Sequence, residues 1–461
     1  MGSCSPWLEC WPRSVGAACA IHPHKSILSI STHFVLTVAY LANQFPSAVE
    51  PYVGEEIQEL RERGVQILAS SVRRPRSEAN AAVGDDSEMP VLCLQPVRLL
   101  ILLQALGLIL WRWNRITSLL TRVLLRGKES PKLRAKALLH TYLGAYYAVL
   151  LRKYRVDHIH VHHGYFGSWI AMVAARLLDI GFSLTLHGSD LLLDGAYLDV
   201  KLESCRFSVT VSEYNRRYIL KRFPATEATK ILVSRLGVDL PAHAEFSRTR
   251  DARGKRRSLS LLAVGRLHAV KDHAFLVRSC AQLRNYGLNF ECAIAGEGPE
   301  RPHLEVLIEQ NRLQDHLRLL GHVAREQMDA LYERADVVVL TSRSEGIPLV
   351  LMEAMARGKI VLAPAITGIS ELVIHEKTGF LYAPGARDDF LTKILFLDEQ
   401  IRRGNQNAVI GLDWLRHAAR VHVLHNFNRR KRLTRFGNQF LQLTAHQDRS
   451  LPYENFILQQ I

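Results

Sequence analysis

Two glutamates, Glu345 and Glu353, stand eight positions apart beside a predicted helix N-terminus. Glu345 falls in a loop, and Glu353 falls on the predicted helix Pro348–Arg357. Free backbone N–H groups and the helix dipole favour anions there, so the amides of Leu349 and Val350 would meet a phosphate. Helical side chains lean toward the N-terminus, which brings Glu353 to the same place. The arrangement suits a ligand with a diphosphate between hydroxyl-bearing rings, because carboxylates accept hydrogen bonds from hydroxyls.

A plainer interpretation is open for both glutamates. Glu353 and Arg357 are four positions apart and could form an ordinary surface ion pair. Glu345 could be a solvated loop residue. Spacing alone favours this interpretation, because short motifs often match by chance.

The elements that would position these glutamates form a strand–loop–helix unit. The apolar, β-branched run Val337–Leu340 predicts a buried strand, and the loop Thr341–Gly346 follows it. Pro348 stands where the first helical position tolerates proline, and Gly358 is a favourable residue at which to end the helix.

Two cations follow another predicted strand. Leu259–Val264 is apolar and is followed by Gly265, Arg266 and Lys271. On their own, these cations could be no more than solvated surface charges. The predicted strand Phe290–Ala295 is followed by Gly-Glu-Gly-Pro, a tight turn that permits close backbone approach, although a lone Gly-x-Gly is weak evidence.

Several histidines lie close together in the first half of the chain. In a strand at Val156–His163, the side chains of His158, His160 and His162 would share one face, and three imidazoles can hold zinc. Metal sites rarely take all their ligands from one strand, however, and the sequence shows no carboxylate spaced to support them. The sequence therefore favours a strand without metal.

A further histidine, His187, follows the predicted strand Phe182–Leu186. The carboxyl end of a strand is where open α/β sheets bind ligands. The alternative is a histidine whose hydrogen bonds are satisfied by the local backbone.

Composition describes a globular protein of two or three domains, with 461 residues, 48% hydrophobic and 22% charged. The net charge of +15 implies an acidic partner. No nucleic-acid recognition motif is present, which leaves anionic lipid and phosphorylated substrates. Seven scattered cysteines without C-x-x-C spacing indicate a reducing compartment and no structural zinc. Residues 1–33 lack a secretory pattern and are expected to be a peripheral, poorly ordered leader.

The N-terminal half predicts a βαβ opening. Phe34–Leu41 is expected to be a strand, Tyr52–Arg63 an amphipathic helix and Val65–Ala69 a second strand, with loops at Asn43–Pro46 and at 71–90. Further strands are expected at 207–212 and 231–239.

The stretch Val97–Leu125 is apolar, with tryptophans and arginines among its residues. Its uninterrupted apolar part is far short of the roughly 20 residues that a spanning helix needs. It could be an interfacial helix at a membrane surface, or a pair of core helices that cover the sheet, which is the commoner outcome in α/β domains.

Five motifs occur in the order of a known family. They are SEGIPLVLMEAMA at 344–356, AVGRLHAVKD at 263–272, AGEGPERPHLE at 295–305, LRLLGHV at 317–323 and GFLY at 379–382. The chain resembles the retaining nucleotide-sugar glycosyltransferases of group 1, with their E-x7-E signature. The segment at 40–64 is similar to the exopolysaccharide branch, although the usual Gly-Gly is absent from the loop at 43–47.

The resemblance implies roles for individual residues. Arg266 and Lys271 would stabilise the diphosphate, Glu345 would orient the donor hexose and Glu353 the ribose, with His187 across the cleft. Group 1 relatives imply a larger donor-binding set, which here comprises Gly265, Gly296, Gly298, Val323, Gly346, Ile347, Pro348, Leu349, Val350 and Glu353.

The implied fold is α/β of the GT-B type, with two Rossmann-like domains facing each other across a cleft. The expected boundaries are 34–241 for an acceptor-side domain, 242–258 for a linker, 259–427 for a donor domain and 428–461 for a terminal helix that returns to the first domain, with a tail. No D-x-D follows a strand, so we expect no catalytic metal and no cofactor.

The implied activity is retaining transfer of a sugar from a nucleotide-diphosphate sugar to a hydroxyl of a sugar or lipid-linked saccharide. Expected partners are those two substrates and an anionic membrane surface, with no nucleic acid. The expected location is the cytoplasm or the inner face of the plasma membrane. The alternatives are a storage-sugar synthase or phosphorylase on the same fold, and a catalytically silent sugar-nucleotide-binding protein.

Overall fold

The computed structural model describes residues 35–47, 50–74, 91–127, 129–192, 195–239, 258–403 and 411–445. From Leu36 onward these residues belong to one compact unit. The predicted leader at 1–33 and all but the last residue of the predicted linker at 242–258 lie outside the described residues. The domain boundaries therefore stay a proposal.

The first sheet is entirely parallel, with strand order β3-β2-β1-β4-β5-β6-β7. Strand order reverses between β1 and β4, which is where a doubly wound sheet opens a crevice for ligands. The strands are β1 Thr37–Gln44, β2 Gln66–Arg73, β3 Leu92–Cys93, β4 His158–His162, β5 Gly181–Leu186, β6 Phe207–Thr210 and β7 Ile231–Val233.

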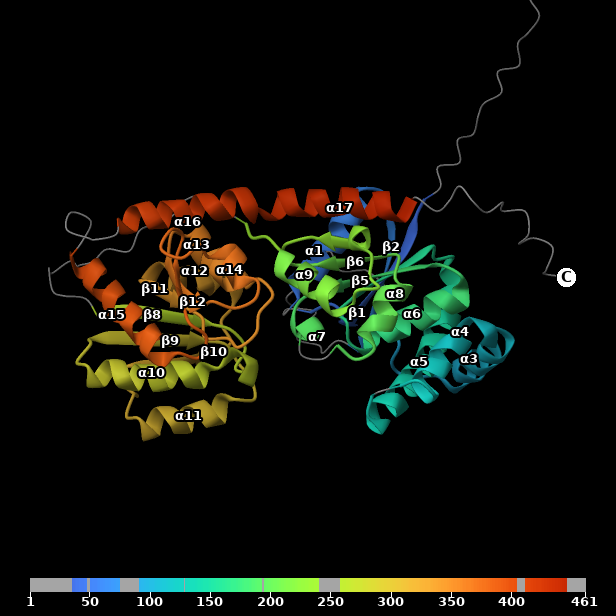
Figure 1. The fold of residues 1–461 in the computed structure, drawn as a ribbon, viewed down its shortest axis with the longest axis horizontal. Helices are drawn as coiled ribbons and strands as arrows, with labels where there is room; N and C mark the ends of the chain where they lie inside the picture. Colours follow the sequence, from blue (N-terminus) through green and yellow to red (C-terminus); the bar gives the residue numbers. More distant parts are fainter. Residues whose placement is uncertain are drawn as a thin grey trace, which may run out of the picture. The chain divides into compact units, whose positions relative to one another are not determined.

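Helices flank this sheet and lie between its strands in the chain (Figure 1). Trp169 of α6 and Tyr147 of α5 are completely buried in one hydrophobic cluster with residues of β4 and β5. The helices are α1 Pro51–Glu62, α3 Leu99–Trp111, α4 Trp113–Leu124, α5 Pro131–Leu151, α6 Phe166–Leu178, α7 Ser189–Leu192, α8 Leu198–Ser204 and α9 Glu213–Arg222, with short 3-10 turns at Arg152–Tyr154 and Ala228–Lys230.

The second sheet is also parallel, with order β10-β9-β8-β11-β12-β13. Its strands are β8 Leu259–Val264, β9 Phe290–Ala295, β10 Leu317–Gly321, β11 Val337–Val339, β12 Ile360–Pro364 and β13 Phe380–Tyr382. Its helices are α10 His273–Asn285, α11 Arg301–Gln310, α12 Arg325–Arg334, α13 Leu349–Ala356, α14 Ile369–Leu372, α15 Arg387–Arg403 and α16 Leu412–Asn426, with a 3-10 turn at Ala269–Lys271. Two parallel α/β halves confirm the predicted fold class.

The last described helix, α17 Arg429–Ala445, packs against the first sheet's elements. Phe436 and Phe440 are buried in one cluster with residues of β1 and α1. Arg63 of α1 donates to the carbonyl of Thr434 at 3.2 Å. The predicted helix Arg429–Gln442 is therefore present and slightly longer.

A second polar contact joins the two halves at α14. The Glu371 carboxylate accepts hydrogen bonds from the backbone N–H groups of Glu213 (3.1 Å) and Tyr214 (2.6 Å) at the start of α9. It also pairs with Arg235 at 2.9 Å. A carboxylate at a helix N-terminus is favourable because it satisfies free amides and the helix dipole.

Several predicted element bounds were wrong. Strand β1 continues through Asn43 to Gln44 because it pairs with β2 along that length, so the loop begins later than predicted. Strand β2 likewise continues to Arg73, within the predicted loop at 71–90. The predicted strand at 231–239 ends at Val233, because its only neighbour, β6, ends at Thr210.

The apolar stretch Val97–Leu125 forms α3 and α4, which meet at an angle of 91°. One face of the pair is in the core, where Leu108, Ile116 and Leu119 are buried. The other face is exposed, so the prediction of a pair of core helices holds for only one side. Within the described residues, no single helix is long and apolar enough to cross a membrane, and α3 with α4 meets that criterion only as a bent pair.

Candidate active site

Lys271 and Glu345 meet in the loops that follow β8 and β11. The Nζ of Lys271 lies 2.5 Å from Oε1 of Glu345, which also accepts a 2.6 Å hydrogen bond from the Ser342 hydroxyl. Only 20% of the Lys271 side chain and 12% of the Glu345 side chain are exposed. The fold thus brings together a cation and a carboxylate from distant parts of the sequence. Glu345 is not a solvated loop residue.

Two tightly packed glycines follow β9 and lie against the loop after β8. A Cβ on Gly296 would lie 2.0 Å from the carbonyl oxygen of Gly265, and Gly296 has a φ of +150°. A Cβ on Gly298 would lie 2.2 Å from the carbonyl oxygen of Leu267. Both positions therefore require glycine, and the predicted close backbone approach occurs here within the protein itself.

The N-terminus of α13 lies directly after Glu345. Pro348 is the N-cap, with extended backbone (φ −75°, ψ 123°), and Leu349 begins the helix, so Pro348 stands one position earlier than predicted. Pro348 and Ile347 are buried, whereas Leu349 and Val350 are partly exposed. The first backbone amides of this helix have no partner within the helix, and a helix N-terminus of this kind favours an anion.

Glu353, one turn further along α13, accepts a 2.7 Å hydrogen bond from the hydroxyl of Tyr332. Burial, followed by the charge of Glu353, raises the pKa of Tyr332 well above its ordinary value, so the tyrosine keeps its proton. Arg357 pairs with Asp329 instead of Glu353. The plainer interpretation, a surface ion pair between Glu353 and Arg357, was therefore wrong.

Two residues that were predicted to bind the nucleotide sugar, Arg266 and Val323, make fewer contacts than Lys271 and Glu345. Arg266 is exposed in the loop after β8, and its charge acts on the carboxylate of Glu50 in the first half. Val323 is partly exposed between β10 and α12. Neither residue is held in place as Lys271 and Glu345 are.

The two halves come close at Gly346. A Cβ there would lie 2.3 Å from the carbonyl oxygen of His187, and a Cβ on Gly188 would lie 3.1 Å from the Gly346 amide nitrogen. The same His187 carbonyl accepts a 3.2 Å hydrogen bond from Asn215. The structure therefore places His187 beside the Glu345 loop.

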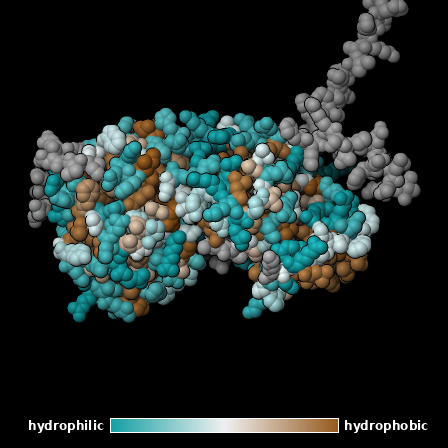
Figure 2. Space-filling model, in the orientation of Figure 1, coloured by the Kyte–Doolittle hydropathy of each residue, from teal (hydrophilic) through white to brown (hydrophobic). Residues whose placement is uncertain are grey.

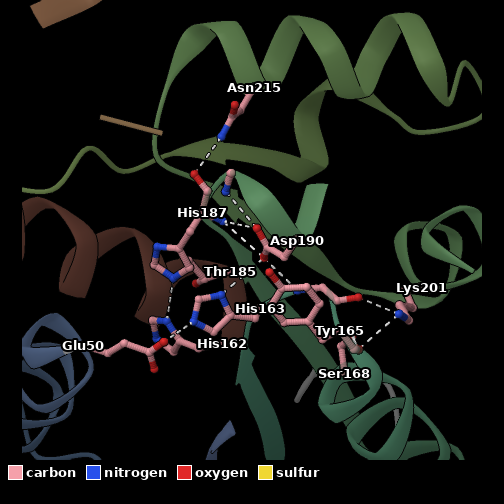
Figure 3. Close-up of polar contacts among 12 residues, drawn as sticks. Glu50, His162, His163, Tyr165, Ser168, Thr185, His187, Asp190, Lys201 and Asn215 are labelled. Atoms are coloured by element: carbon pink, nitrogen blue, oxygen red, sulfur yellow. Dashed lines mark hydrogen bonds and ion pairs between the residues drawn. The ribbon is translucent and has the colours of Figure 1, made fainter. Parts of the chain in front are cut away.

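Figure 3 shows the histidines at the ends of β4 and β5. The Nε2 of His187 lies 3.0 Å from the Nδ1 of His162, and the His187 ring centroid lies 4.7 Å from that of Tyr52. Burial, followed by the charges of His163 and His162, lowers the pKa of His187 well below its ordinary value. His187 is therefore a neutral imidazole at neutral pH.

His163 has the opposite character. Its Nε2 lies 2.9 Å from Glu50 and its Nδ1 lies 3.6 Å from Asp190, which also accepts 2.8 Å hydrogen bonds from the backbone of Gly164 and Gly188. Burial alone would lower the pKa of His163, but Asp190 and Glu50 raise it to about 10. His163 is therefore an imidazolium held between two carboxylates.

The predicted shared face of His158, His160 and His162 is confirmed, because all three side chains are buried on one side of β4. The expectation that no carboxylate accompanies them was wrong. Glu56 of α1 lies 3.1 Å from Nε2 of His162. Because α1 is far from β4 in the sequence, no local spacing could have indicated this contact.

Glu56, His160 and His162 offer ligand atoms within 4.8 Å of one another, a spacing that a metal ion could use. Both ring nitrogens of His160 already have partners, Ser183 at 2.7 Å and Thr185 at 3.0 Å. Burial lowers the pKa of His160 well below its ordinary value, so it is neutral. We interpret the group as a hydrogen-bond network that holds His162 against His187.

The arrangement combines a helix N-terminus, two cations and two carboxylates beside a neutral histidine. Such a set can bind a diphosphate and orient hydroxyl groups around it. The sequence analysis missed the supporting residues Ser342, Tyr332, Glu50, Glu56 and Asp190. Asp190 belongs to the HGSD segment that follows β5, which was the one available signal.

Known structures share this fold over most of its length. A glycosyltransferase from Rickettsia africae matches with a TM-score of 0.62 at 17% identity. The match covers 90% of this chain and 100% of the Rickettsia chain. Sucrose-phosphate synthase from Thermosynechococcus elongatus has a TM-score of 0.66 at 18% identity, covering 89% and 100%. Anabaena Alr3699/HepE, solved with UDP, has a TM-score of 0.63 at 16% identity, covering 88% and 100%. The fold is that of the GT-B class.

Family models match both halves of the chain. Residues 247–405 match Glycosyl transferases group 1, and residues 49–241 match Glycosyltransferase Family 4. The first half of the chain thus carries a Glycosyltransferase Family 4 domain, and the second half carries a Glycosyl transferases group 1 domain.

Two curated relatives match over about a third of the chain. They are the putative colanic acid biosynthesis glycosyltransferase WcaL of Escherichia coli (37% identical over 33% of this chain and 38% of the relative) and the amylovoran biosynthesis glycosyltransferase AmsK of Erwinia amylovora (34% identical over 34% and 39%). The matched segment spans about two fifths of each relative's length.

Proposed function

We propose that the protein is a retaining glycosyltransferase that moves a sugar from a nucleoside-diphosphate sugar to an acceptor hydroxyl during exopolysaccharide synthesis. The observation that carries the proposal is the largely shielded contact between Lys271 and Glu345 at the N-terminus of α13. It supplies a fixed cation and a carboxylate where a diphosphate and its sugar would lie. The exopolysaccharide assignment draws on the similarity to WcaL and AmsK.

The leaving diphosphate gains negative charge in the transition state, which fixed positive groups stabilise. Lys271 and Arg266 would supply that charge, together with the amides of Leu349 and Val350. Glu345 would accept hydrogen bonds from the donor sugar. Glu353, with one oxygen held by Tyr332, would accept from the ribose.

The acceptor would approach from the first half. His187 is neutral, and within the described residues its side chain hydrogen-bonds through Nε2 to His162. Its Nδ1 could then meet a hydroxyl of the donor sugar. Retention would follow if the acceptor hydroxyl attacked the face that the diphosphate leaves, with a phosphate oxygen taking the proton.

We expect turnover without a divalent metal, because Lys271 and Arg266 would neutralise the diphosphate in place of a metal. Full activity in excess chelator would support this expectation. Activity that vanished in chelator and returned with manganese would contradict it.

We further propose that the protein works at an anionic membrane surface. The apolar exposed side of α3 and the net charge of +15 support this placement. Vesicle flotation at low and high salt tests it. Binding that salt weakens would support the proposal, and no association with anionic vesicles at low salt would oppose it.

The experiment for the transfer reaction is mass spectrometry of products from a panel of nucleotide sugars and lipid-linked saccharides. A glycosylated acceptor with release of nucleoside diphosphate is the expected result. Donor binding by calorimetry without any product across the panel would instead support a silent sugar-nucleotide-binding protein.

A further inference from the structure

A basic hollow lies at the edge of the first sheet opposite His187. It has a volume of about 690 Å³ and is lined by the starts of α4 and β5, by residues of α6, and by residues just before β6 and β7. His187 follows β5, whereas Gly181 begins it. Six strand residues at about 3.3 Å each separate the two places by roughly 20 Å. The hollow is therefore not part of the candidate active site.

Positive charge dominates the lining. Lys230, which pairs with Glu227 at 2.7 Å, and the arginines Arg115 and Arg176 line it. One carboxylate, Asp179, lines it too. That carboxylate is already engaged, because it pairs with Arg112 at 2.5 Å and with Arg115 at 2.7 Å. Two arginines thus share one carboxylate, and within the described residues Arg176 pairs with none, so the hollow keeps an excess of positive charge that suits a multiply charged anion.

Arg176 is the most informative of these cations. Its guanidinium donates to the hydroxyls of Ser118 at 2.9 Å and Ser204 at 2.7 Å, which carry no charge. Burial lowers the pKa of Arg176, because desolvation disfavours its charged form. An arginine fixed by two hydroxyls is preorganised to bind a phosphate oxygen.

An apolar surface begins beside the hollow. On α3, large apolar side chains that are 45–72% exposed recur at spacings that place them on one side of the helix. This exposed apolar stripe consists of Leu99, Leu100, Leu103, Leu106, Leu110 and Trp111. Figure 2 shows hydrophobic colour gathered over the α3 and α4 region, at the lower right.

Tryptophans join the stripe to the hollow. Trp111 and Trp113, which are 64% and 62% exposed, flank the corner between α3 and α4, and Asn114 and Arg115 of the hollow follow at once. Exposed tryptophans between apolar and charged groups are typical of a membrane–water interface. Because α3 has 13 residues, or roughly 20 Å, and its other side packs in the core, it can lie on a bilayer but not cross it.

We propose that this hollow binds the phosphomonoester headgroup of an anionic phospholipid while the stripe on α3 enters the outer part of the same leaflet. The inference rests on the proposed membrane placement and adds the site and the headgroup chemistry. A phosphomonoester carries up to two negative charges, which match the excess of cations. A phosphodiester offers fewer charges and fewer free oxygens to the arginines.

The test is flotation of the full chain with vesicles of matched surface charge, containing either phosphatidic acid or phosphatidylglycerol. The wild type should prefer phosphatidic acid. Arg176→Gln combined with Lys230→Gln should weaken that binding roughly fivefold to 30-fold, since each basic group at an anionic surface contributes about 1 kcal/mol. Arg402→Gln with Arg403→Gln, on α15 of the other half, removes the same charge and should change binding less than twofold.

Arg115→Gln with Lys230→Gln serves if the first variant has a lower melting temperature than the control. Equal binding to both lipids, or a preference that survives in both hollow variants, would overturn the site but leave the membrane placement standing. No flotation with any vesicle would overturn both.

Two further arms separate the other occupants. The first arm compares the melting temperature with glycerol 3-phosphate and with short-chain phosphatidic acid. If both raise the melting temperature equally, the hollow binds a soluble phosphate ligand, and the proposal of a lipid headgroup is overturned. Leu103→Gln with Leu110→Gln should abolish flotation without changing mass by light scattering. A fall from dimer to monomer mass would mean that the stripe binds a second copy.

Discussion

Lys271→Ala should test the donor site most cleanly, because the structure defines what the lysine does in the free protein. Its ammonium contacts Glu345 at 2.5 Å, and 80% or more of each side chain is shielded from solvent. The substitution removes a fixed cation from the place where the diphosphate gains charge. Preorganised groups of this kind contribute about 3–4 kcal/mol, so kcat should fall on the order of 100- to 1000-fold.

Stability should change much less than activity. Glu345 keeps its hydrogen bond from Ser342, and a partly exposed ion pair contributes about 1 kcal/mol or less to folding. Arg343→Ala is the matched control, since Arg343 is 67% exposed and pairs with Asp272 instead. Calorimetry should show that Lys271→Ala weakens nucleoside diphosphate more than monophosphate. Unchanged kcat and unchanged diphosphate affinity would refute the assignment.

Three other predictions concern Glu353 at the proposed ribose site, His163 between its two carboxylates, and Gly346 where the two halves come close. Glu353→Gln should raise the donor KM more than it lowers kcat, because the ribose does not change during reaction; a pure kcat loss would count against this role. The pKa of His163 is raised to about 10, so its stabilising contribution is complete below about pH 6.5 and is lost as the pH rises through 10. The unfolding free energy of wild type should therefore fall over that window more steeply than that of His163→Gln, and parallel curves in urea would disprove it. Gly346→Ala should cost about 1–3 kcal/mol of stability and most of the activity, since its Cβ would lie 2.3 Å from the His187 carbonyl oxygen. Gly54→Ala, with open space around it, should cost nothing, and equal effects of the two variants would contradict the close contact.

Local patterns in the sequence predicted four elements of the second half, namely β8, β9, β11 and α13. Strands at Leu259–Val264 and Phe290–Ala295 were predicted with their observed bounds, because each is a mostly apolar run that a glycine follows. The helix that carries Glu353 was also predicted, within one residue at each end. These signals are local, and each depends on neighbouring residues only.

Contacts between distant residues were not predictable from such patterns. The pairing of Glu56 with His162 joins α1 to β4, and the partner of Arg357 turned out to be Asp329 on α12. Strand ends also depended on neighbours, since β7 stops where β6 offers no further partner. The exposed side of α3 was also not predictable, because the sequence of an apolar helix does not indicate whether its second side contacts protein or solvent.

The measurement that tests the central claim most directly is proton NMR of the product formed from a nucleoside-diphosphate sugar and a lipid-linked saccharide. The account predicts one new glycosidic bond with the anomeric configuration of the donor, and one nucleoside diphosphate released for each bond. A product of inverted configuration, or release of the nucleotide without a new glycosidic bond across the whole donor panel, would contradict it.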